Sequence, residues 1–401
     1  MKFVTYAENS EQLKKIHKEA SSLNIDLNKL EVIVGTNSLS RFSENSFSDL
    51  MEMISLNQTL KLPLLLEWDI LAQENRFKNS TEELLKLPLH EFIAIRLQDP
   101  GAVNFIKSHF PWLKIQLILE NGNHNFEGLC RWSDFLGEQL DRLILSNELS
   151  REHLVKYSQS LKAKIEVLAF GRILLFYSPR LLLSPLKKSE ISENLKAKNL
   201  EAYGTSEESP HSGFPLIENA HGTFMFNVKD LSLIEHINEL KEMNVEAVRF
   251  DLRFDNSLIF LEKFLSHALV KDEVTLGSEI KSKHPRALIK GFYNVNKSDV
   301  LFPKLKNSRI QRFDTHYLGE VIDVERDEQI TLMIKSEDLC LNIGDSIRLV
   351  TPEGKIKISF IKELKNISKE NLNKVSRDEI CTIPYLSGIV AKTQVYLEQK
   401  T

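Results

Sequence analysis

The chain has 401 residues and a nearly balanced charge, with 52 Lys and Arg against 56 Asp and Glu and a formal net charge of −4. This length allows two domains with a large buried core, and 42% hydrophobic with 27% charged residues is typical of a globular protein. This nearly balanced charge excludes a basic field over the whole protein that would attract nucleic acids or anionic membranes. Local basic patches are still compatible with it.

The cysteines and the hydropathy pattern exclude further classes. Cys130, Cys340 and Cys381 lie far apart without Cys-x-x-Cys spacing, which argues against a disulfide framework, a zinc site or a cluster site. We interpret them as buried thiols and predict no metal site. No stretch approaches the ~20 apolar residues of a membrane span, and the N-terminus has no apolar signal core. The sequence therefore predicts a cytoplasmic protein without a membrane span.

Up to about residue 290, short apolar runs alternate with segments of helical periodicity. The predicted strands are Leu30–Gly35, Leu62–Trp68, Phe92–Leu97, Ile115–Leu119, Leu143–Leu145, Ile165–Phe170, Phe224–Phe226 and Ala247–Leu252. The clearest predicted helices are Ser10–Ser22, Ser48–Ser55, Val103–Phe110, Glu152–Leu161 and Leu231–Met243. Eight strands alternating with helices predict an α/β fold, a (β/α)8 TIM-like barrel over residues 1–300.

Two segments depart from this alternation. The stretch at 187–215 is rich in Ser, Gly, Pro and charge without a steady period, which predicts an irregular excursion. After about residue 310 the pattern changes to strands separated by turn signals such as Gly344-Asp345. The predicted strands there are Leu318–Val324, Gln329–Ile334, Ser346–Val350, Ile356–Ile361 and Gly388–Leu397. They predict a small closed C-terminal β-barrel over residues 311–401.

In a (β/α)8 barrel the active face is built where the strands end, so polar residues that follow the apolar runs are the candidate site residues. They are Glu67, Asp69, Gln98, Asp99, Glu120, Glu148, Arg172, Asn227, Asp230, Arg249, Asp251 and Arg253. No catalytic serine or cysteine nucleophile can be assigned from spacing, and there is no phosphate loop or dinucleotide fingerprint.

Arg249, Asp251 and Arg253 alternate along one strand and so share one face. Two interpretations stay open. In the first, Asp251 neutralises both arginines and the trio only closes the barrel. In the second, the trio leaves a positive charge in excess, and Arg172 and Arg180 join it in a site for a small anion or a phosphate backbone, since buried charge is costly without a partner.

Several motifs occur in a fixed order along the chain. Gly171-Arg172 leads into Tyr177-Ser178-Pro179-Arg180-Leu181, after Asp99-Pro100-Gly101 with Pro111-Trp112-Leu113, and before Asn227-x-x-Asp230-Leu231 and Arg249-Phe250-Asp251-Leu252-Arg253. In this order they resemble motifs of the collagenase-like peptidase family U-32, from the first strand to about residue 260. The C-terminal barrel resembles one found in the RNA-hydroxylation branch of that family.

The resemblance implies a 4Fe-4S cluster held by cysteines, but this chain departs from the pattern at the ligand positions. Leu174 and Leu181 stand where relatives have cysteines, so no cofactor is predicted and the chain is interpreted as a divergent member. Leucines of that size are expected to fill the volume of the cluster with packed core. By the same resemblance, Ser178 and Arg180 line the mouth of the barrel.

The resemblance leaves three functions open. The first is a protein related to tRNA or rRNA base hydroxylation, acting either as a cluster-less paralogue that binds RNA or a partner protein or as an enzyme without iron. The second is a collagenase-like peptidase. The third is a partner protein in quinone hydroxylation. The C-terminal barrel favours the RNA branch, and cluster-dependent hydroxylation is disfavoured.

Overall fold

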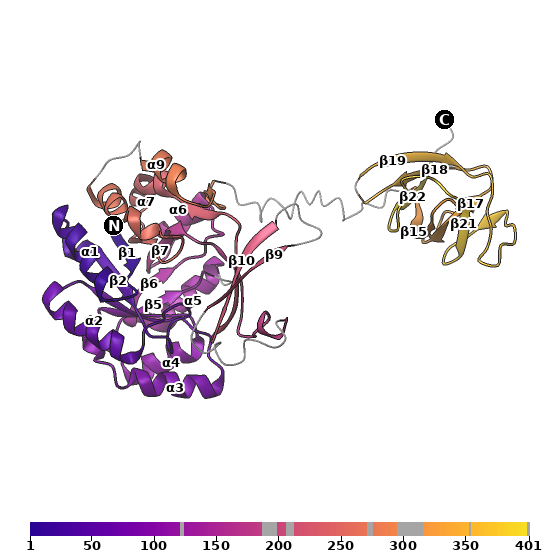
Figure 1. Ribbon diagram of the computed structural model, residues 1–401. Helices are drawn as coiled ribbons and strands as arrows, with labels where there is room; N and C mark the ends of the chain where they lie inside the picture. Colours follow the sequence, from indigo (N-terminus) through magenta and orange to yellow (C-terminus); the bar gives the residue numbers. More distant parts are fainter. Residues whose placement is uncertain are drawn as a thin grey trace. The chain divides into compact units, whose positions relative to one another are not determined.

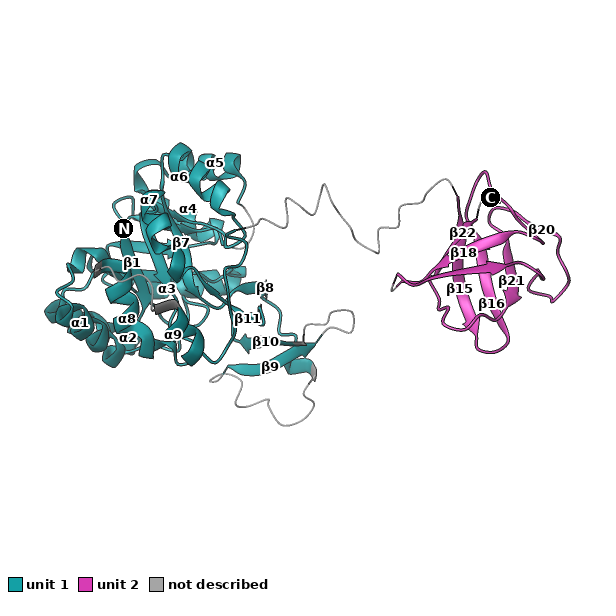
Figure 2. Ribbon diagram, turned by 90° about the horizontal axis from the view of Figure 1, so that it is seen from above, with its two compact units in different colours: residues 1–296 teal, residues 297–401 magenta. Residues whose placement is uncertain are grey.

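The computed structural model describes residues 1–120, 124–186, 199–205, 212–270, 276–294, 316–352 and 354–398. The chain divides into two compact units, residues 1–296 and 297–401 (Figure 2). Each unit has a hydrophobic core of its own. Within the described ranges, no helix is long and apolar enough to cross a membrane.

The N-terminal unit contains a closed barrel of eight parallel strands, surrounded by helices (Figure 1). Around the barrel the strands are β1 Lys2–Tyr6, β2 Leu30–Val34, β3 Leu64–Trp68, β4 Ala94–Leu97, β5 Ile115–Ile118, β6 Leu140–Ile144, β7 Lys164–Gly171 and β13 Ala247–Phe250. The barrel closes because β13 pairs in parallel with both β7 and β1. The predicted TIM-like barrel is confirmed.

The helices of this unit connect successive strands. They are α1 Ser10–Ser22, α2 Phe47–Leu60, α3 Glu74–Leu84, α4 Pro100–His109, α5 Phe126–Leu136, α6 Arg151–Ser160, α7 Ile237–Glu242, α8 Leu261–Leu265 and α9 Leu276–Lys283, with a π-turn at Ser266–Val270. Short 3-10 turns occupy Leu27–Lys29, Leu89–Glu91, Gly137–Gln139, Ser184–Leu186, Ile234–His236 and Ser257–Phe260. Side-chain caps fix where helices begin: Ser46 and Asp49 form a capping box at α2, and Ser150 caps α6.

Two predicted elements differ from the structure, and one barrel strand was missed. The eighth barrel strand is β1 at the start of the chain, where the polar Lys2 and Thr5 interrupt the apolar pattern. Phe224–Phe226 belongs to a separate antiparallel sheet. The predicted helix Leu231–Met243 begins instead with a short strand, β12 Asp230–Ser232, and becomes helical only from Ile234. β12 pairs antiparallel to β7 and parallel to β14 Leu288–Ile289, so it extends the barrel sheet.

A four-stranded antiparallel sheet is inserted between β7 and β12, and we call it the inserted sheet. Its strands, in spatial order, are β8 Leu174–Ser178, β11 Gly222–Phe226, β10 Ser212–Asn219 and β9 Leu200–Thr205. β8 and β11 approach so closely that a Cβ on Gly222, whose φ is +130°, would lie 2.0 Å from the Ser178 carbonyl oxygen. Of the predicted excursion at 187–215, residues 187–198 and 206–211 lie outside the described residues, and the described parts belong to β9 and β10.

The C-terminal unit is an antiparallel half-barrel. Its six-stranded sheet has the order β19 Ile356–Phe360, β18 Ser346–Val350, β22 Gln394–Leu397, β15 Tyr317–Glu325, β16 Gln329–Ile334 and β21 Ile380–Pro384. A second ladder joins β17 Leu341–Asn342 to β20 Lys374–Val375. Alternate residues of β16 and β18 are buried in one core. The predicted C-terminal β-barrel is confirmed, but it is a half-barrel. Its sheet is not closed, because β19 and β21 lie at its two ends.

Candidate functional site at the barrel mouth

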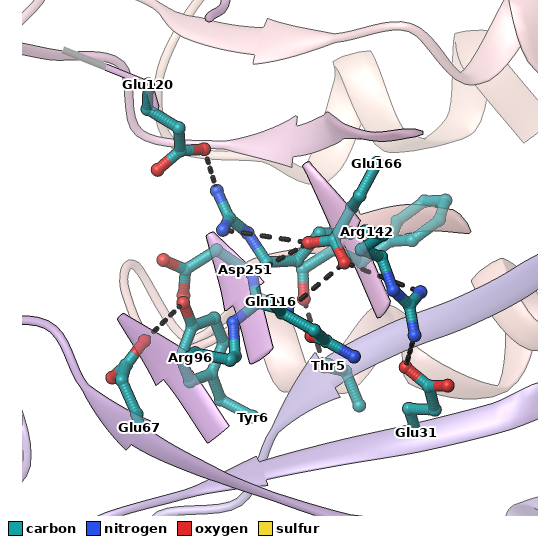
Figure 3. Close-up of polar contacts among 12 residues, drawn as sticks. Thr5, Tyr6, Glu31, Glu67, Arg96, Gln116, Glu120, Arg142, Glu166 and Asp251 are labelled. Carbon is teal, nitrogen blue, oxygen red and sulfur yellow. Dashed lines mark hydrogen bonds and ion pairs between the residues drawn. The ribbon is translucent and has the colours of Figure 1, made fainter. Parts of the chain in front are cut away.

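The interior of the barrel contains a network of paired charges (Figure 3) beside a small apolar cluster that includes Val4, Ile33 and Leu65. Arg96 of β4 contacts Glu166 of β7 at 2.8 Å, and Arg142 of β6 pairs with Glu31 of β2 and lies 3.6 Å from Glu166. All four side chains are fully buried, so each charge depends on its partner. Burial alone would raise the pKa of Glu166, but Arg96 and Arg142 outweigh it and lower the pKa. This network forms a charged floor below the mouth.

The arginines predicted at the end of β13 lie above this floor, and each has its own carboxylate. Arg249 pairs with Glu120, which follows β5, and lies 3.8 Å from Glu166. Arg253 binds Asp251 through two hydrogen bonds, of 2.9 and 2.7 Å, and lies 3.7 Å from Glu67. The predicted positive excess is therefore wrong, because the count from sequence left out Glu120 and Glu67. Asp251 neutralises only one of the two arginines.

Tyr6 lies at the centre of the mouth. Its ring centroid is 3.5 Å from the guanidinium carbon of Arg253, and its hydroxyl donates a 3.0 Å hydrogen bond to Glu67. Burial and the neighbouring Asp69 raise the pKa of Glu67, and burial raises that of Tyr6. For Asp251 burial acts in the same direction, but Arg253 and Arg249 outweigh it and lower the pKa. The mouth thus holds a pair of carboxyl groups, Glu67 and Asp251, whose pKa values are shifted in opposite directions.

The close packing at the end of β7 requires glycine. Gly171 has a φ of +142°, and a Cβ there would lie 2.9 Å from the Cβ of Asp251. The next residue, Arg172, points its guanidinium to Asp255 with hydrogen bonds of 2.9 and 3.0 Å. Its guanidinium carbon is also 4.5 Å from the ring centroid of Phe254. Arg172 therefore belongs to the mouth, as predicted from its place after the strand.

An aromatic wall closes the mouth between the barrel and the inserted sheet. Phe42, from the loop after β2, packs against Phe224 and Phe226 of β11 and against Phe254, with ring centroids 4.6, 5.8 and 5.5 Å away. Beside it, Arg41 binds Asp69 at 2.6 Å. Sequence reasoning missed Arg41, Phe42 and Phe254, because they lie in irregular loops where no periodic pattern marks them.

These groups line a pocket at the mouth of the barrel. Its lining combines the guanidinium groups of four arginines with three phenylalanine rings, namely Arg41, Arg172, Arg249, Arg253, Phe42, Phe226 and Phe254. The buried Nη1 of Arg41 and Nε of Arg249 have no hydrogen-bond partner within the described part of the chain. Both donors are buried in residues that line the pocket, and a buried N–H without a partner is costly.

The remaining predicted residues lie elsewhere. Ser178 accepts the backbone N–H of Arg180 in the turn after β8, the Arg180 side chain is exposed, and neither residue is part of the described pocket wall. Asp230 accepts hydrogen bonds from His284 and Arg286, at 2.8 and 2.9 Å. Arg286 also donates a hydrogen bond to the Asn227 carbonyl. Asn227 and Asp230 therefore bind the segment before β14 to the start of β12.

The donor set of this chain does not fit an iron–sulfur cluster. Leu174 lines the pocket and packs on the phenylalanines of β11, while Leu181 is 46% exposed, and neither side chain has an atom that binds iron. The exposure of Leu181 corrects the expectation that both leucines fill a packed core. Cys130 lies in α5, whereas Cys340 and Cys381 lie in the C-terminal unit.

Comparisons with known proteins identify the family of this chain. The model described as peptidase family U32 matches residues 16–298. tRNA hydroxylation protein P of Escherichia coli (strain K12) is 21% identical over 328 residues, which cover 69% of this chain and 71% of that protein. tRNA hydroxylation protein P2 of Bacillus subtilis (strain 168) is 20% identical over 175 residues, which cover 43% of this chain and 56% of that protein.

The solved structure of the U32 peptidase Mk0906 aligns with 43% of this chain and 70% of its own, at 10% identity and a TM-score of 0.33. The family model spans well over half of the chain, including every strand of the barrel from β2 to β13. The protein belongs to peptidase family U32.

Proposed function

We propose that this protein binds tRNA in the cytoplasm as a cluster-less member of its family, and that the barrel mouth holds one nucleotide of the RNA. The observation that carries the proposal is the pocket that joins four guanidinium groups to three phenylalanine rings. Rings supply faces on which a base stacks, and guanidinium groups bind phosphate or carbonyl oxygens.

The comparisons support RNA rather than the two alternatives. The relatives from Escherichia coli, Haemophilus influenzae and Bacillus subtilis are all named for tRNA hydroxylation. Peptidase activity and a role in quinone hydroxylation remain the alternatives, but no contact in the mouth favours either. The proposal assigns binding and no reaction, because the cluster that the family resemblance implies has no fitting donors at Leu174 and Leu181.

The test is the thermal stability of the full chain with uridine monophosphate, uridine, phosphate and a short RNA. A ligand that binds the native state at about a hundred times its Kd adds about 2.7 kcal/mol of stability, which raises the unfolding temperature by several degrees. We expect the largest rise with the nucleotide and the RNA. We expect Arg172→Met to lose most of that rise, because it removes a guanidinium from the mouth.

Arg172→Met is a suitable variant because Arg286 remains 3.8 Å from Asp255 after the change. Its matched control is Arg131→Met, which removes an exposed guanidinium from the surface of α5. Equal ligand-induced shifts in the wild type and Arg172→Met would contradict the proposed site. If phosphate raises the unfolding temperature as much as the nucleotide does, the site binds only a small anion, and the stacking of a base is contradicted.

A further inference from the structure

The edge strand β19 of the C-terminal unit carries a row of exposed apolar side chains. Ile356, Ile358 and Phe360 alternate along the strand, so they share one face of the sheet. They are 60%, 63% and 57% exposed, whereas Ile361, at the end of the strand, is buried in the core. Together with Ile367 in the following loop, they are the most exposed large apolar side chains of the described part of this unit. Apolar side chains grouped on a surface mark interaction sites.

β19 also ends the six-stranded sheet, and β18 is its one partner strand among the described residues (Figure 1). The opposite edge strand, β21, is met by a bridge from Lys365 to Thr382. An edge strand offers unpaired main-chain groups, and proteins usually protect such strands with charge or cover. An uncovered apolar row at this edge therefore points to a binding surface.

Positive charge is concentrated in the same segment. Residues 354–375 contain six lysines against two glutamates, whereas residues 316–352 and 376–398 contain five basic against eleven acidic residues. Lys357, Lys362 and Lys369 are all exposed. The segment around β19 is thus rich in lysine within an otherwise acidic unit, and its charge is complementary to an anionic partner.

Arg348 of β18 and Tyr396 of β22 lie on the same face of the sheet as the apolar row. Arg348 of β18 stands opposite Ile358, and Tyr396 of β22 stands opposite Arg348. The guanidinium carbon of Arg348 lies 4.5 Å from the ring centroid of Tyr396. Tyr396 itself is buried, and Arg348 also pairs with Glu398 at 3.4 Å, whereas the ring of Phe360 on the same face is exposed. An exposed aromatic ring, a neighbouring arginine and nearby lysines are groups that bind single-stranded nucleic acid.

We propose that β19 and the loop up to residue 375 form a second RNA-binding surface, with bases on Phe360 and its apolar neighbours and phosphates on the lysines. This inference rests on the proposed function, since it takes RNA as the ligand, and adds a contact on the other unit. An acidic peptide strand could pair with the edge of β19, but the exposed ring of Phe360, close to Arg348 on the same face, favours bases.

The test is the anisotropy of a fluorescent, unmodified tRNA transcript titrated with the full chain at several salt concentrations. Phe360→Ser should weaken binding about tenfold, the usual effect of losing one stacked base. Lys362→Gln/Lys369→Gln should also weaken binding and lower the slope of log affinity against log salt by about 1.4, since each lost phosphate contact lowers it by about 0.7. The matched controls, Val390→Ser and Lys335→Gln/Lys392→Gln, remove exposed residues outside the segment and should bind as the wild type does.

The outcomes separate this inference from the proposed function. If the wild type binds tRNA and the β19 variants bind equally well, the inference is wrong and the mouth remains the RNA site. If the wild type does not bind tRNA, both are wrong. Sedimentation velocity on the same variants tests whether the row is a protein interface. If Phe360→Ser dissociates an oligomer and leaves the affinity for RNA unchanged, the row binds protein, and the proposed RNA surface is contradicted.

Discussion

Arg253 makes the densest set of contacts in the barrel mouth. Its guanidinium binds Asp251 through two hydrogen bonds, lies near Glu67 and covers the ring of Tyr6. The side chain is only 8% exposed, so its removal leaves Asp251 buried without its main partner. Because an unpaired buried charge is costly, the residue is a structural support of the mouth as well as a candidate ligand group.

We predict that Arg253→Met lowers the free energy of unfolding by about 3 kcal/mol. Asp251→Asn in the same chain should recover part of this loss, because it removes the carboxylate that was left unpaired. Urea unfolding followed by tryptophan fluorescence measures the effect. Trp68, Trp112 and Trp132 are the three tryptophans of the chain, and all lie in the N-terminal unit. The two single variants predict a summed loss of stability for the double variant. A double variant that loses more than this sum would contradict the pairing of Arg253 with Asp251.

Glu239 of α7 provides a pH-dependent link outside the mouth. It binds His236 at 2.8 Å, Arg151 at 2.8 Å and Tyr293 at 3.1 Å, and these contacts, His236 first, lower its pKa from 4.5 to about 2. A carboxyl group with a lowered pKa in the folded state stabilises the fold above pH 4.5, and this contribution is lost as the pH falls towards 2.

Glu239→Gln should therefore destabilise the N-terminal unit by about 1 kcal/mol or less at pH 7, because Glu239 is partly exposed. The difference from the wild type should be smaller at pH 3. Urea midpoints from tryptophan fluorescence at the two pH values measure it, with Glu242→Gln on the same helix as the control. A difference that is equal at both pH values would show that the carboxylate charge is not the cause.

The mouth residues on or just after strands could be predicted from the sequence pattern. Those in loops could not. Arg249, Asp251 and Arg253 follow from alternation on β13, and Arg172 from its place after β7. Arg41 and Phe42 come from the irregular chain after β2, and their position depends on the inserted sheet packing against them. The charge balance was wrong for the same reason, because pairing between strands far apart in sequence cannot be read from one strand.

At the scale of elements, Glu218 of β10 holds the turn that follows β8. Its carboxylate accepts the backbone N–H groups of Leu183 and Ser184, at 2.7 and 2.8 Å, and the hydroxyls of Ser184 and Thr223. Burial raises the pKa of Glu218, but these hydrogen bonds outweigh burial and lower it. In this chain a carboxylate therefore orders the segment in which relatives are expected to carry cluster ligands.

We expect Glu218→Ala to loosen this turn without unfolding the barrel. Amide hydrogen exchange at Leu183 and Ser184 should become at least tenfold faster, since both amides lose their acceptor. Exchange in β2 to β6 should be unchanged. Glu201→Gln on the neighbouring strand β9 is the control and should leave the turn as it is. Unchanged exchange at the two amides in Glu218→Ala would show that other contacts hold the turn.

The element pattern of the barrel was largely predictable, and its exceptions have local causes. Mostly apolar runs mark β2 to β7, because buried parallel strands are rich in apolar residues even where a charged residue such as Glu31 or Arg96 points into the barrel. β1 was missed because Lys2 and Thr5 interrupt its run, and Lys2 is needed there as the partner of Glu31. Phe224–Phe226 is as apolar as a barrel strand because β11 buries its rings on Phe42. An apolar run of three residues does not show which sheet it joins.

At the scale of the whole molecule, the change of pattern after about residue 310 corresponds to a separate C-terminal unit. In that unit Gln329–Ile334 and Ser346–Val350 are strands with the predicted bounds, because every second residue of each is buried. β21 was missed, and the sheet proved to be a half-barrel. Closure of a sheet depends on pairing between strands distant in sequence, which alternation does not encode.

The two units give the protein two surfaces on which RNA would bind, the mouth and β19, and the mouth is the central claim. The most direct measurement is photochemical crosslinking of a thiouridine-containing tRNA transcript to the full chain, followed by mass spectrometry of the crosslinked peptides. The account predicts adducts on peptides that contain Phe42 or Phe254, which excess uridine monophosphate suppresses and which Arg172→Met reduces. Adducts confined to peptides outside the mouth, or unaffected by the nucleotide, would contradict it.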